Sequence, residues 1–280
     1  MLPSLSCASS NISKVLGTVY NTMVRIPETH PRRESLLIRE RLIEGFHQGL
    51  VSEAGLIAHG RGEALDYLLG EETPPEAAEA VRAAAAMLLL AKHPVISVNG
   101  NVAALCPREV VRLAEVTQAS IEVNIFYRTE ERVQRIAAWL YKHGAKEVLG
   151  TDPKFREKIP ELQSERRWVD RRGIWRADVV LLALEDGDRT EALRRLGKQV
   201  IAIDLNPLSR TARAANITIV DNVVRALPAL IQEVEKLRTV DKIALQRILS
   251  EYDNELVLRA ALRRMCSSPE RLRMVKIRER

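Results

Sequence analysis

The chain has 280 residues, of which 46% are hydrophobic, so it is long and apolar enough to bury a substantial core. Its 43 Lys and Arg residues outnumber its 37 Asp and Glu residues, and the net charge of +6 favours an anionic partner such as a phosphorylated metabolite or nucleic acid. The longest purely apolar run, residues 83–91, is too short to span a bilayer, so no membrane partner is expected. The three widely spaced cysteines suit neither disulfides nor a zinc site, which predicts a cytoplasmic protein.

The first 92 residues divide into an extension and a helical region. Residues 1–22 are Ser-rich and lack the basic and apolar segments of a secretory signal, so we expect a disordered N-terminal extension. Residues 23–92 predict a helical N-terminal region. Apolar residues recur at three- and four-residue spacing from Arg32 to Gln48, and the Ala- and Leu-rich run Pro75–Lys92 opens with a proline and an acid.

Residues 93–238 alternate between short β-branched runs and helical patterns. The expected strands are 95–98, 121–126, 179–184, 200–204 and 217–220, and the expected helices are 102–117, 129–143, 188–196 and 223–237. This alternation predicts an α/β fold with a Rossmann-like, doubly wound and mostly parallel sheet. A polar excursion is expected over residues 150–177, and residues 239–280 predict a basic helical tail that is solvated and has no specific ligand.

The segments that directly follow the expected strands carry polar side chains. In such sheets, ligands bind outside the carboxyl ends of the strands, at the point where the strand order reverses. These segments are rich in amides, hydroxyls, carboxylates and arginines: Asn99–Asn101, Tyr127–Arg128, Glu185–Thr190, Leu205–Thr211 and Asp221–Asn222. A single turn of this composition is commonly structural, but five of them on one edge predict a binding site.

Two glycine motifs lack the third glycine of a dinucleotide fingerprint. In Asn99-Gly100-Asn101, two carboxamides flank the only glycine and offer hydrogen bonds without charge. In Gly60-Arg61-Gly62, an arginine between two glycines suits a phosphate, because glycine permits close backbone approach. The same motif equally suits a helix C-terminus with a solvent-facing arginine, so both interpretations remain open.

Charged residues after the later strands suit a nucleotide. Glu185, Asp186 and Asp188 are able to hold magnesium or, alternatively, to favour the start of the following helix. Asp204 stands at a strand end, where a carboxylate often binds a ribose hydroxyl, and Arg210 follows within reach of phosphate. The histidines show no metal-ligand spacing, and the sequence has no Ser-centred nucleophile motif, so neither a dedicated metal site nor a covalent serine mechanism is expected.

Five long segments together resemble the archaeal 4-phosphopantoate–β-alanine ligase family, also called the phosphopantothenate synthetase family. They are IPETHPRRESLLIRERLIEG, GLIAHGRGEALDYLLGE, HPVISVNGNVAAL, LEDGDRTEALRRLGK and IDLNPLSRTARAANITIVDN. The likeness runs from about Met23 to about Leu237. Residues 1–22 precede the usual start of the family, and we match no family pattern after about Thr239.

The resemblance implies an ATP- and Mg²⁺-dependent condensation in coenzyme A synthesis on a Rossmann-like homodimer. The carboxylate of 4-phosphopantoate is adenylated with loss of pyrophosphate, and the amine of β-alanine then displaces AMP. Carried onto matching positions, the resemblance implies ATP contacts at Arg39, Arg61, Asp204, Leu205, Asn206, Arg210, Thr211, Asn222 and Val223.

The same resemblance suggests roles for the Asn99-Gly100-Asn101 turn and for charged residues near it. Asn99, Gly100 and Asn101 become candidates for holding the hydroxyl and carboxylate of phosphopantoate. Arginines such as Arg61 and Arg189 would neutralise the repulsion between a carboxylate and an α-phosphate. His59 or a carboxylate of Glu185-Asp186 would serve as the general base for the amine, and the sequence does not choose between them.

Two alternatives come from other classes of protein. A nucleic-acid-binding module would use the basic tail, but only 4% of the residues are aromatic and none cluster into a stacking platform. A small-molecule kinase would use a related fold, but the phosphate loop G-x-x-x-x-G-K-[ST] is missing from the sequence. The ligase is therefore the favoured function, with no nucleic-acid partner.

Overall fold

The computed structural model describes residues 26–267, so the expectation of a disordered extension over residues 1–22 lies outside the described residues, as does the end of the basic tail. The chain separates into two units, residues 1–40 and 41–280. Helix α2 (Arg33–His47) begins in the first unit, where it contains Arg39, and ends in the second.

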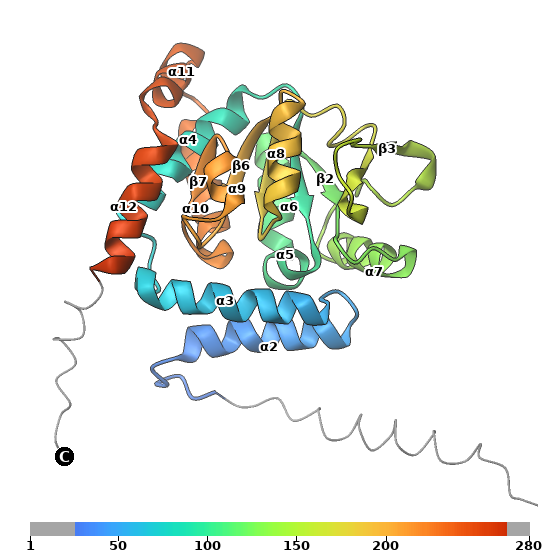
Figure 1. Ribbon diagram of the computed structural model, residues 1–280, viewed down its shortest axis with the longest axis horizontal. Coiled ribbons are helices and arrows are strands. Elements are labelled where there is room, and N and C mark those ends of the chain that lie inside the picture. Colours follow the sequence, from blue (N-terminus) through green and yellow to red (C-terminus); the bar gives the residue numbers. More distant parts are fainter. Residues whose placement is uncertain (1–25, 268–280) are drawn as a thin grey trace, which may run out of the picture. The chain divides into compact units, whose positions relative to one another are not determined.

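Five parallel strands form the central sheet (Figure 1). They are β1 (Pro94–Val98), β2 (Ser120–Val123), β5 (Val179–Ala183), β6 (Gln199–Ile203) and β7 (Ile217–Ile219), in the order β2-β1-β5-β6-β7. The chain moves outward from β1 to β2 and then returns to the other side of β1, so the strand order reverses between β1 and β5. This order is the flavodoxin-like variant of the doubly wound sheet, and the predicted α/β, mostly parallel fold is confirmed.

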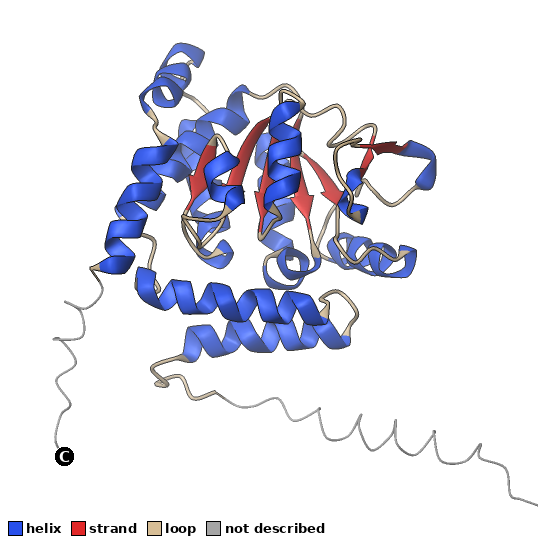
Figure 2. Ribbon diagram, in the orientation of Figure 1, coloured by secondary structure: helices blue, strands red, loops and turns tan. Residues whose placement is uncertain are grey.

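Helices cover both faces of the sheet (Figures 1 and 2). On one face α10 (Val223–Leu237) packs against α4 (Pro75–Leu90) and α6 (Pro107–Thr117), while α8 (Gly187–Arg195) and α9 (Arg210–Ala214) pack on β6. Val180 and Leu182 pack into one buried cluster with the excursion and α8. Because successive side chains of a strand point to opposite faces, burial of both faces explains why β5 is apolar throughout.

Several elements differ from the sequence prediction. The expected helix over 102–117 is two helices, α5 (Gly100–Leu105) and α6, because Pro107 has no N–H and disfavours a helical conformation at Cys106. The excursion contains an antiparallel hairpin of β3 (Arg156–Lys158) and β4 (Trp168–Asp170), with short 3-10 helices η1 (Pro153–Phe155) and η2 (Glu165–Arg167). Helix α7 (Glu130–Lys142), by contrast, agrees with the expected helix over 129–143, and the Thr129 side chain caps its first turn.

The C-terminal region folds back onto the core. It contains α11 (Lys242–Glu251) and α12 (Asn254–Cys266). Three side chains of α12 are buried in a cluster that also holds Leu69 and Leu205: Leu258, Ala261 and Met265. Helix α12 is therefore part of the packed unit, whereas the sequence predicted a solvated helix.

Helix α3 (Glu53–Leu69) lies in the predicted helical region 23–92, but the sequence analysis assigned no helix to these residues. Gly60 and Gly62 lie inside this helix, so the alternative of a helix C-terminus at Gly60-Arg61-Gly62 is wrong, whereas contact of Arg61 with a phosphate stays a prediction. Each glycine weakens a helix, but the Ser52 side chain caps the first turn, Gly70 ends the helix at φ 108°, and Leu65 and Leu69 pack against the cluster around Leu205. Helix α3 lies across the carboxyl ends of the strands (Figure 2).

None of the helices between residues 26 and 267 has the length and apolar content that crossing a bilayer requires.

Candidate active site

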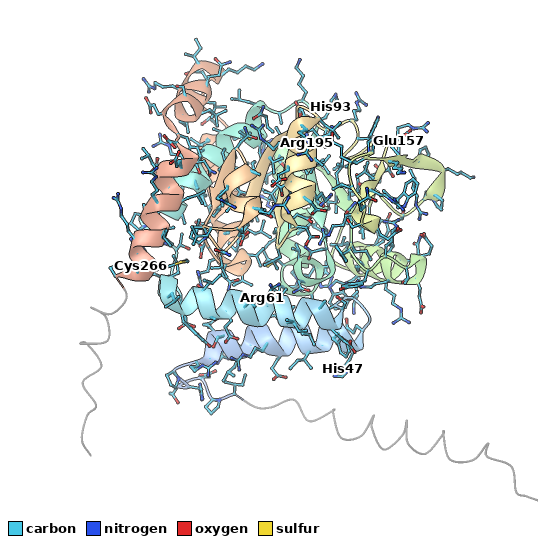
Figure 3. All side chains as sticks on the ribbon, viewed as in Figure 1. His47, Arg61, His93, Glu157, Arg195 and Cys266 are labelled. Carbon is cyan, nitrogen blue, oxygen red and sulfur yellow. The ribbon has the colours of Figure 1, made fainter. Side chains whose placement is uncertain are left out.

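A pocket of about 230 Å³ opens at the carboxyl ends of β1, β2 and β5, where the strand order reverses. Helix α3 covers it, and Figure 3 labels Arg61 on this helix, at the end of the sheet opposite to His93 and Arg195. The lining residues are Ser52, Ala54, Gly55, Ala58, Arg61, Asn99, Gly100, Asn101, Ile125, Phe126, Tyr127, Arg132, Arg166, Leu184 and Asp186. The volume suits a small metabolite rather than a whole nucleotide.

The Asn99-Gly100-Asn101 turn builds one wall of this pocket. The Asn99 Oδ1 atom accepts a hydrogen bond from the Val102 amide at 3.1 Å, and its Nδ2 donates to the Ala183 carbonyl at 2.8 Å. The Asn101 Nδ2 donates to the Gly55 carbonyl at 2.8 Å. The two carboxamides therefore hold β1, β5 and α3 together while they face the pocket.

The space around residue 100 accommodates glycine but no larger residue. A Cβ atom at this position would lie 2.1 Å from the Leu50 carbonyl oxygen and 2.7 Å from Nη2 of Arg132. The single glycine of the turn thus makes room for a backbone carbonyl and a guanidinium.

Leu184 adds a strained residue to the pocket. It follows β5 with φ 54°, a left-handed conformation that is costly for a branched side chain, by about 1–3 kcal/mol. Its carbonyl accepts a second hydrogen bond from Asn99 Nδ2 at 3.2 Å. Strain of this kind is commonly found at functional sites, and here it occurs at the strand end that meets the pocket.

Behind the pocket wall, Glu185 lies between two arginines. Its carboxylate is 2.5 Å from Nη1 of Arg166 and 2.5 Å from Nη1 of Arg189, and its side chain is 2% exposed. Arg189 is fully buried and also donates to the Ser97 hydroxyl at 3.1 Å. Burial lowers the pKa of Arg189, and the charge of Glu185 opposes this shift. Arg189, a predicted catalytic residue, does not line the pocket and instead positions Glu185.

Arg166 and Asp186 carry charge into the pocket itself. Nε of Arg166 is 2.8 Å from Oδ2 of Asp186, and both residues line the cavity. Burial raises the pKa of the Asp186 carboxyl, Arg166 opposes the shift, and the nearby charges of Glu185 and Asp188 reinforce it. An aspartate in this environment is a stronger base than an exposed one.

The excursion delivers Arg166 and is anchored by Glu122 of β2. The Glu122 carboxylate accepts hydrogen bonds from the amides of Asp170 at 2.9 Å and Ile174 at 2.6 Å. This side chain is fully buried, and burial raises its pKa to about 7, against the effect of the two amides. Glu122 therefore ties the excursion to the sheet next to the pocket.

Two of the three candidate magnesium ligands, Glu185 and Asp186, have an arginine partner. Arg166 pairs with both Glu185 and Asp186. Among residues 26–267, no group of three or more His, Cys, Asp or Glu side chains has the arrangement of a metal site.

Seven of the nine residues assigned to ATP by resemblance, all except Arg39 and Arg61, lie along the carboxyl ends of β6 and β7. The Asp204 carboxylate accepts hydrogen bonds from the Asn206 amide at 2.9 Å and from the Ser209 hydroxyl, and burial raises its pKa. Leu205 is buried under α3, and Val223 begins α10 after the cap residue Asn222. These residues border the loops after the last two strands and do not line the pocket.

Two contacts connect this edge with the rest of the site. The Thr211 hydroxyl donates to the Glu185 carbonyl at 3.0 Å, which joins the loop after β6 to the loop after β5. Asn222 Nδ2 donates to the Asp66 carboxylate on α3 at 2.8 Å. Arg210 is exposed and pairs with Glu191 of α8 at 2.8 Å.

Of the remaining predicted site residues, only one lines the pocket. Arg61 is exposed and lines the pocket, whereas His59 is half-buried in the same helix and does not line it. Arg39 belongs to the first unit, whereas all residues that line the pocket belong to the second. Sequence reasoning missed Arg132 and Arg166. One lies within an ordinary amphipathic helix and the other in the polar excursion, so neither had a local signal.

The chain is similar to a family model and to several named proteins. Residues 76–268 match the model described as phosphopantothenate/pantothenate synthetase. The 4-phosphopantoate–β-alanine ligase of Thermococcus kodakarensis is 57% identical over 233 residues, which cover 83% of this chain and 88% of that protein. The protein of the same name from Methanosarcina mazei is 52% identical over 240 residues, which cover 86% and 94%.

A third relative of the same name, from Methanospirillum hungatei, is 54% identical over 202 residues, which cover 72% of this chain and 82% of that protein. The family match also extends to residue 268, beyond Leu237, where the likeness seen in the sequence ends. The predicted family is confirmed. The chain is a ligase and belongs to the phosphopantothenate/pantothenate synthetase family.

Proposed function

We propose that this enzyme joins 4-phosphopantoate to β-alanine at the expense of ATP, and that the reaction passes through an acyl-adenylate. The observation that carries the proposal is the small pocket at the strand-order reversal, which is lined by Arg61, Arg132 and Arg166. It suits a small polyanion. The loops after β6 and β7 border the pocket, and in this proposal they bind the nucleotide. The three relatives described above bear the name of this activity.

In this proposal the enzyme accelerates the reaction mainly by orienting its substrates and by neutralising their negative charges. The carboxylate of the acid and the α-phosphate of ATP repel each other, so arginines around the pocket lower the barrier to their approach. Asn99 and Asn101 hold the pocket wall against which the acid lies. Attack of the carboxylate oxygen on the α-phosphorus expels pyrophosphate, and attack of the amine on the acyl carbon then expels AMP.

The β-alanine amine must lose a proton before it attacks. Asp186 lines the pocket and has a raised pKa, whereas Glu185 is enclosed by two arginines. We therefore assign the general base to Asp186 rather than to Glu185 or His59.

Magnesium enters the proposal only as the counter-ion of the triphosphate. Glu185 and Asp186 pair with arginines, and no group of three or more potential ligands occurs among residues 26–267, so the described side chains do not fit a protein-held magnesium ion. No step of the mechanism is routed through the metal. Because the reaction consumes ATP, we place the enzyme in the cytoplasm.

The products test the reaction. Purified enzyme incubated with ATP, magnesium, 4-phosphopantoate and β-alanine is expected to release AMP and pyrophosphate in equal amounts with 4′-phosphopantothenate. Release of ADP and phosphate would contradict the proposal, because attack would then fall on the γ-phosphate, as in a kinase.

Arg61→Ala is expected to weaken ATP or acid binding by about one to two decades, because a charge-assisted bond to phosphate is lost. The fold is expected to remain intact, since Arg61 is exposed on α3. Steady-state kinetics with each substrate varied, together with the thermal unfolding midpoint, measure both effects. Unchanged KM and kcat values for all substrates would show that Arg61 is only a solvated side chain.

We also propose that the enzyme is a homodimer. Ile57 is 67% exposed and Leu68 is 44% exposed on α3, and within residues 26–267 no atom comes within 4 Å of a Cβ placed at Gly60. Large apolar side chains exposed on one helix suit contact with a second copy. A monomer mass by light scattering at micromolar concentration would contradict this assembly.

A further inference from the structure

Arg132 is a half-buried cation that faces the pocket without a carboxylate partner. Its Nε donates to the Leu50 carbonyl at 3.0 Å, and its Nη1 donates to the Tyr127 carbonyl at 3.1 Å. Among the ion pairs of residues 26–267, none includes Arg132. Burial lowers its pKa, and the charge of Arg166 adds to that shift. The two carbonyls fix the guanidinium in place without neutralising it.

The charges around the pocket leave a positive excess. Arg166 is matched by Asp186, and Glu185 behind the wall is matched by Arg189. Arg61 and Arg132 are the remaining charged lining residues, and both are cations. A half-buried positive charge with no counter-ion is costly unless a ligand supplies the anion. The pocket is therefore built for a ligand with more than one negative charge.

Gly100 adds a steric reason for the same conclusion. Because this residue has no Cβ, Nη2 of Arg132 lies against the Asn99-Gly100-Asn101 turn, and any larger residue would displace the guanidinium. The turn and the arginine thus form one corner of the pocket, at the side where β2 ends.

The strand order determines which end of the acid meets this corner. Arg132 belongs to α7, which follows β2 at one edge of the sheet, whereas the proposed nucleotide segments follow β6 and β7 at the other edge. The carboxylate must reach the α-phosphate, so it points toward β5 and β6. The phosphate ester is at the opposite end of the acid and therefore points toward β2.

We propose that Arg132 binds the phosphate group of the acid substrate, so that the pocket selects a phosphorylated hydroxy acid over its unphosphorylated form. This inference rests on the proposed function. It also answers a question raised by the family description, which names both phosphopantothenate and pantothenate synthesis. Arg132 is then the residue that determines which of the two acids this enzyme accepts.

The test compares the binding of 4-phosphopantoate and pantoate by titration calorimetry, with competition titrations for weak binding. Arg132→Gln is expected to weaken 4-phosphopantoate binding about 10- to 100-fold while pantoate binding changes little, since only the phosphate contact is lost. Arg132→Lys is expected to be intermediate, because it keeps the charge but loses the planar fork. ATP affinity is expected to stay unchanged in both variants.

Arg135→Gln is the matched control. Arg135 lies on the same helix, donates to the Gln48 carbonyl at 3.5 Å and pairs with Glu131, but it does not line the pocket. Its variant is expected to bind both acids as the wild type does. Thermal unfolding midpoints identify any variant that is misfolded. If Arg132→Gln is misfolded, the test rests on the ratio of the affinities for the two acids in the wild-type enzyme and in Arg132→Lys.

The proposal is overturned if the wild-type enzyme binds both acids equally well, or if the Arg132 variants lose affinity for both acids to the same extent. Failure of the ligase reaction itself is a separate result. It appears as a lack of AMP formation by the wild-type enzyme, whatever the ratio of acid affinities.

Discussion

Replacing Glu185 by alanine is expected to lower the free energy of unfolding by about 3–5 kcal/mol, because two buried arginines lose their shared counter-ion. The Glu185 side chain is 2% exposed and contacts Arg166 and Arg189. Turnover is expected to be lost as well, since Arg166 lines the pocket and its position depends on this pair. Urea unfolding followed by circular dichroism at neutral pH measures the stability change.

Glu191→Ala provides the matched control for this experiment. Glu191 lies on α8, just after Glu185, and its pair with Arg210 is exposed to solvent. Exposed ion pairs contribute little to stability, so this variant is expected to unfold almost as the wild type does. Equal, small effects of the two substitutions would show that the buried cluster does not stabilise the site.

Asp186→Asn is expected to slow the complete reaction by roughly 10²–10⁴-fold, the usual contribution of a general base. The substitution keeps the size of the side chain, and the first half-reaction does not need the amine. Exchange of pyrophosphate into ATP without β-alanine is therefore expected to persist. Parallel loss of exchange and ligation would assign Asp186 to adenylation instead.

The same assignment predicts a pH dependence. The pKa of Asp186 is raised mainly by burial, so its carboxylate becomes protonated at a higher pH than an exposed aspartate does. The rate of ligation is therefore expected to fall as the pH decreases through this raised pKa, and this acidic limb is expected to vanish in Asp186→Asn. If the limb vanishes in His59→Gln instead, the base is His59.

The sheet was predictable because each of its strands is a short apolar run next to a helical pattern. Strand ends and helix breaks depended on single residues, as at Pro107, which separates α5 from α6. Helix α3 was missed because Gly60 and Gly62 are weak helix formers. Its stability comes from Leu65 and Leu69 packing on residues more than a hundred positions away, and no local pattern shows that.

The site was predictable only in part, because several of its residues come together only through contacts between distant parts of the sequence. The Asn99-Gly100-Asn101 turn was found because it follows a clear strand, and topology then brings it to the pocket. Arg132 and Arg166 reach the pocket from a helix and from the excursion, which are separated from that turn along the chain. Only the folded chain brings these arginines together and gives Glu185 its two partners.

The most direct test of the acyl-adenylate mechanism is exchange of labelled pyrophosphate into ATP in the absence of β-alanine. The account predicts exchange that requires 4-phosphopantoate, because the acid must first form an adenylate and release pyrophosphate. β-Alanine is expected to convert that exchange into net AMP formation. Net ligation with ADP as the nucleotide product, and with no acid-dependent exchange, would contradict the account.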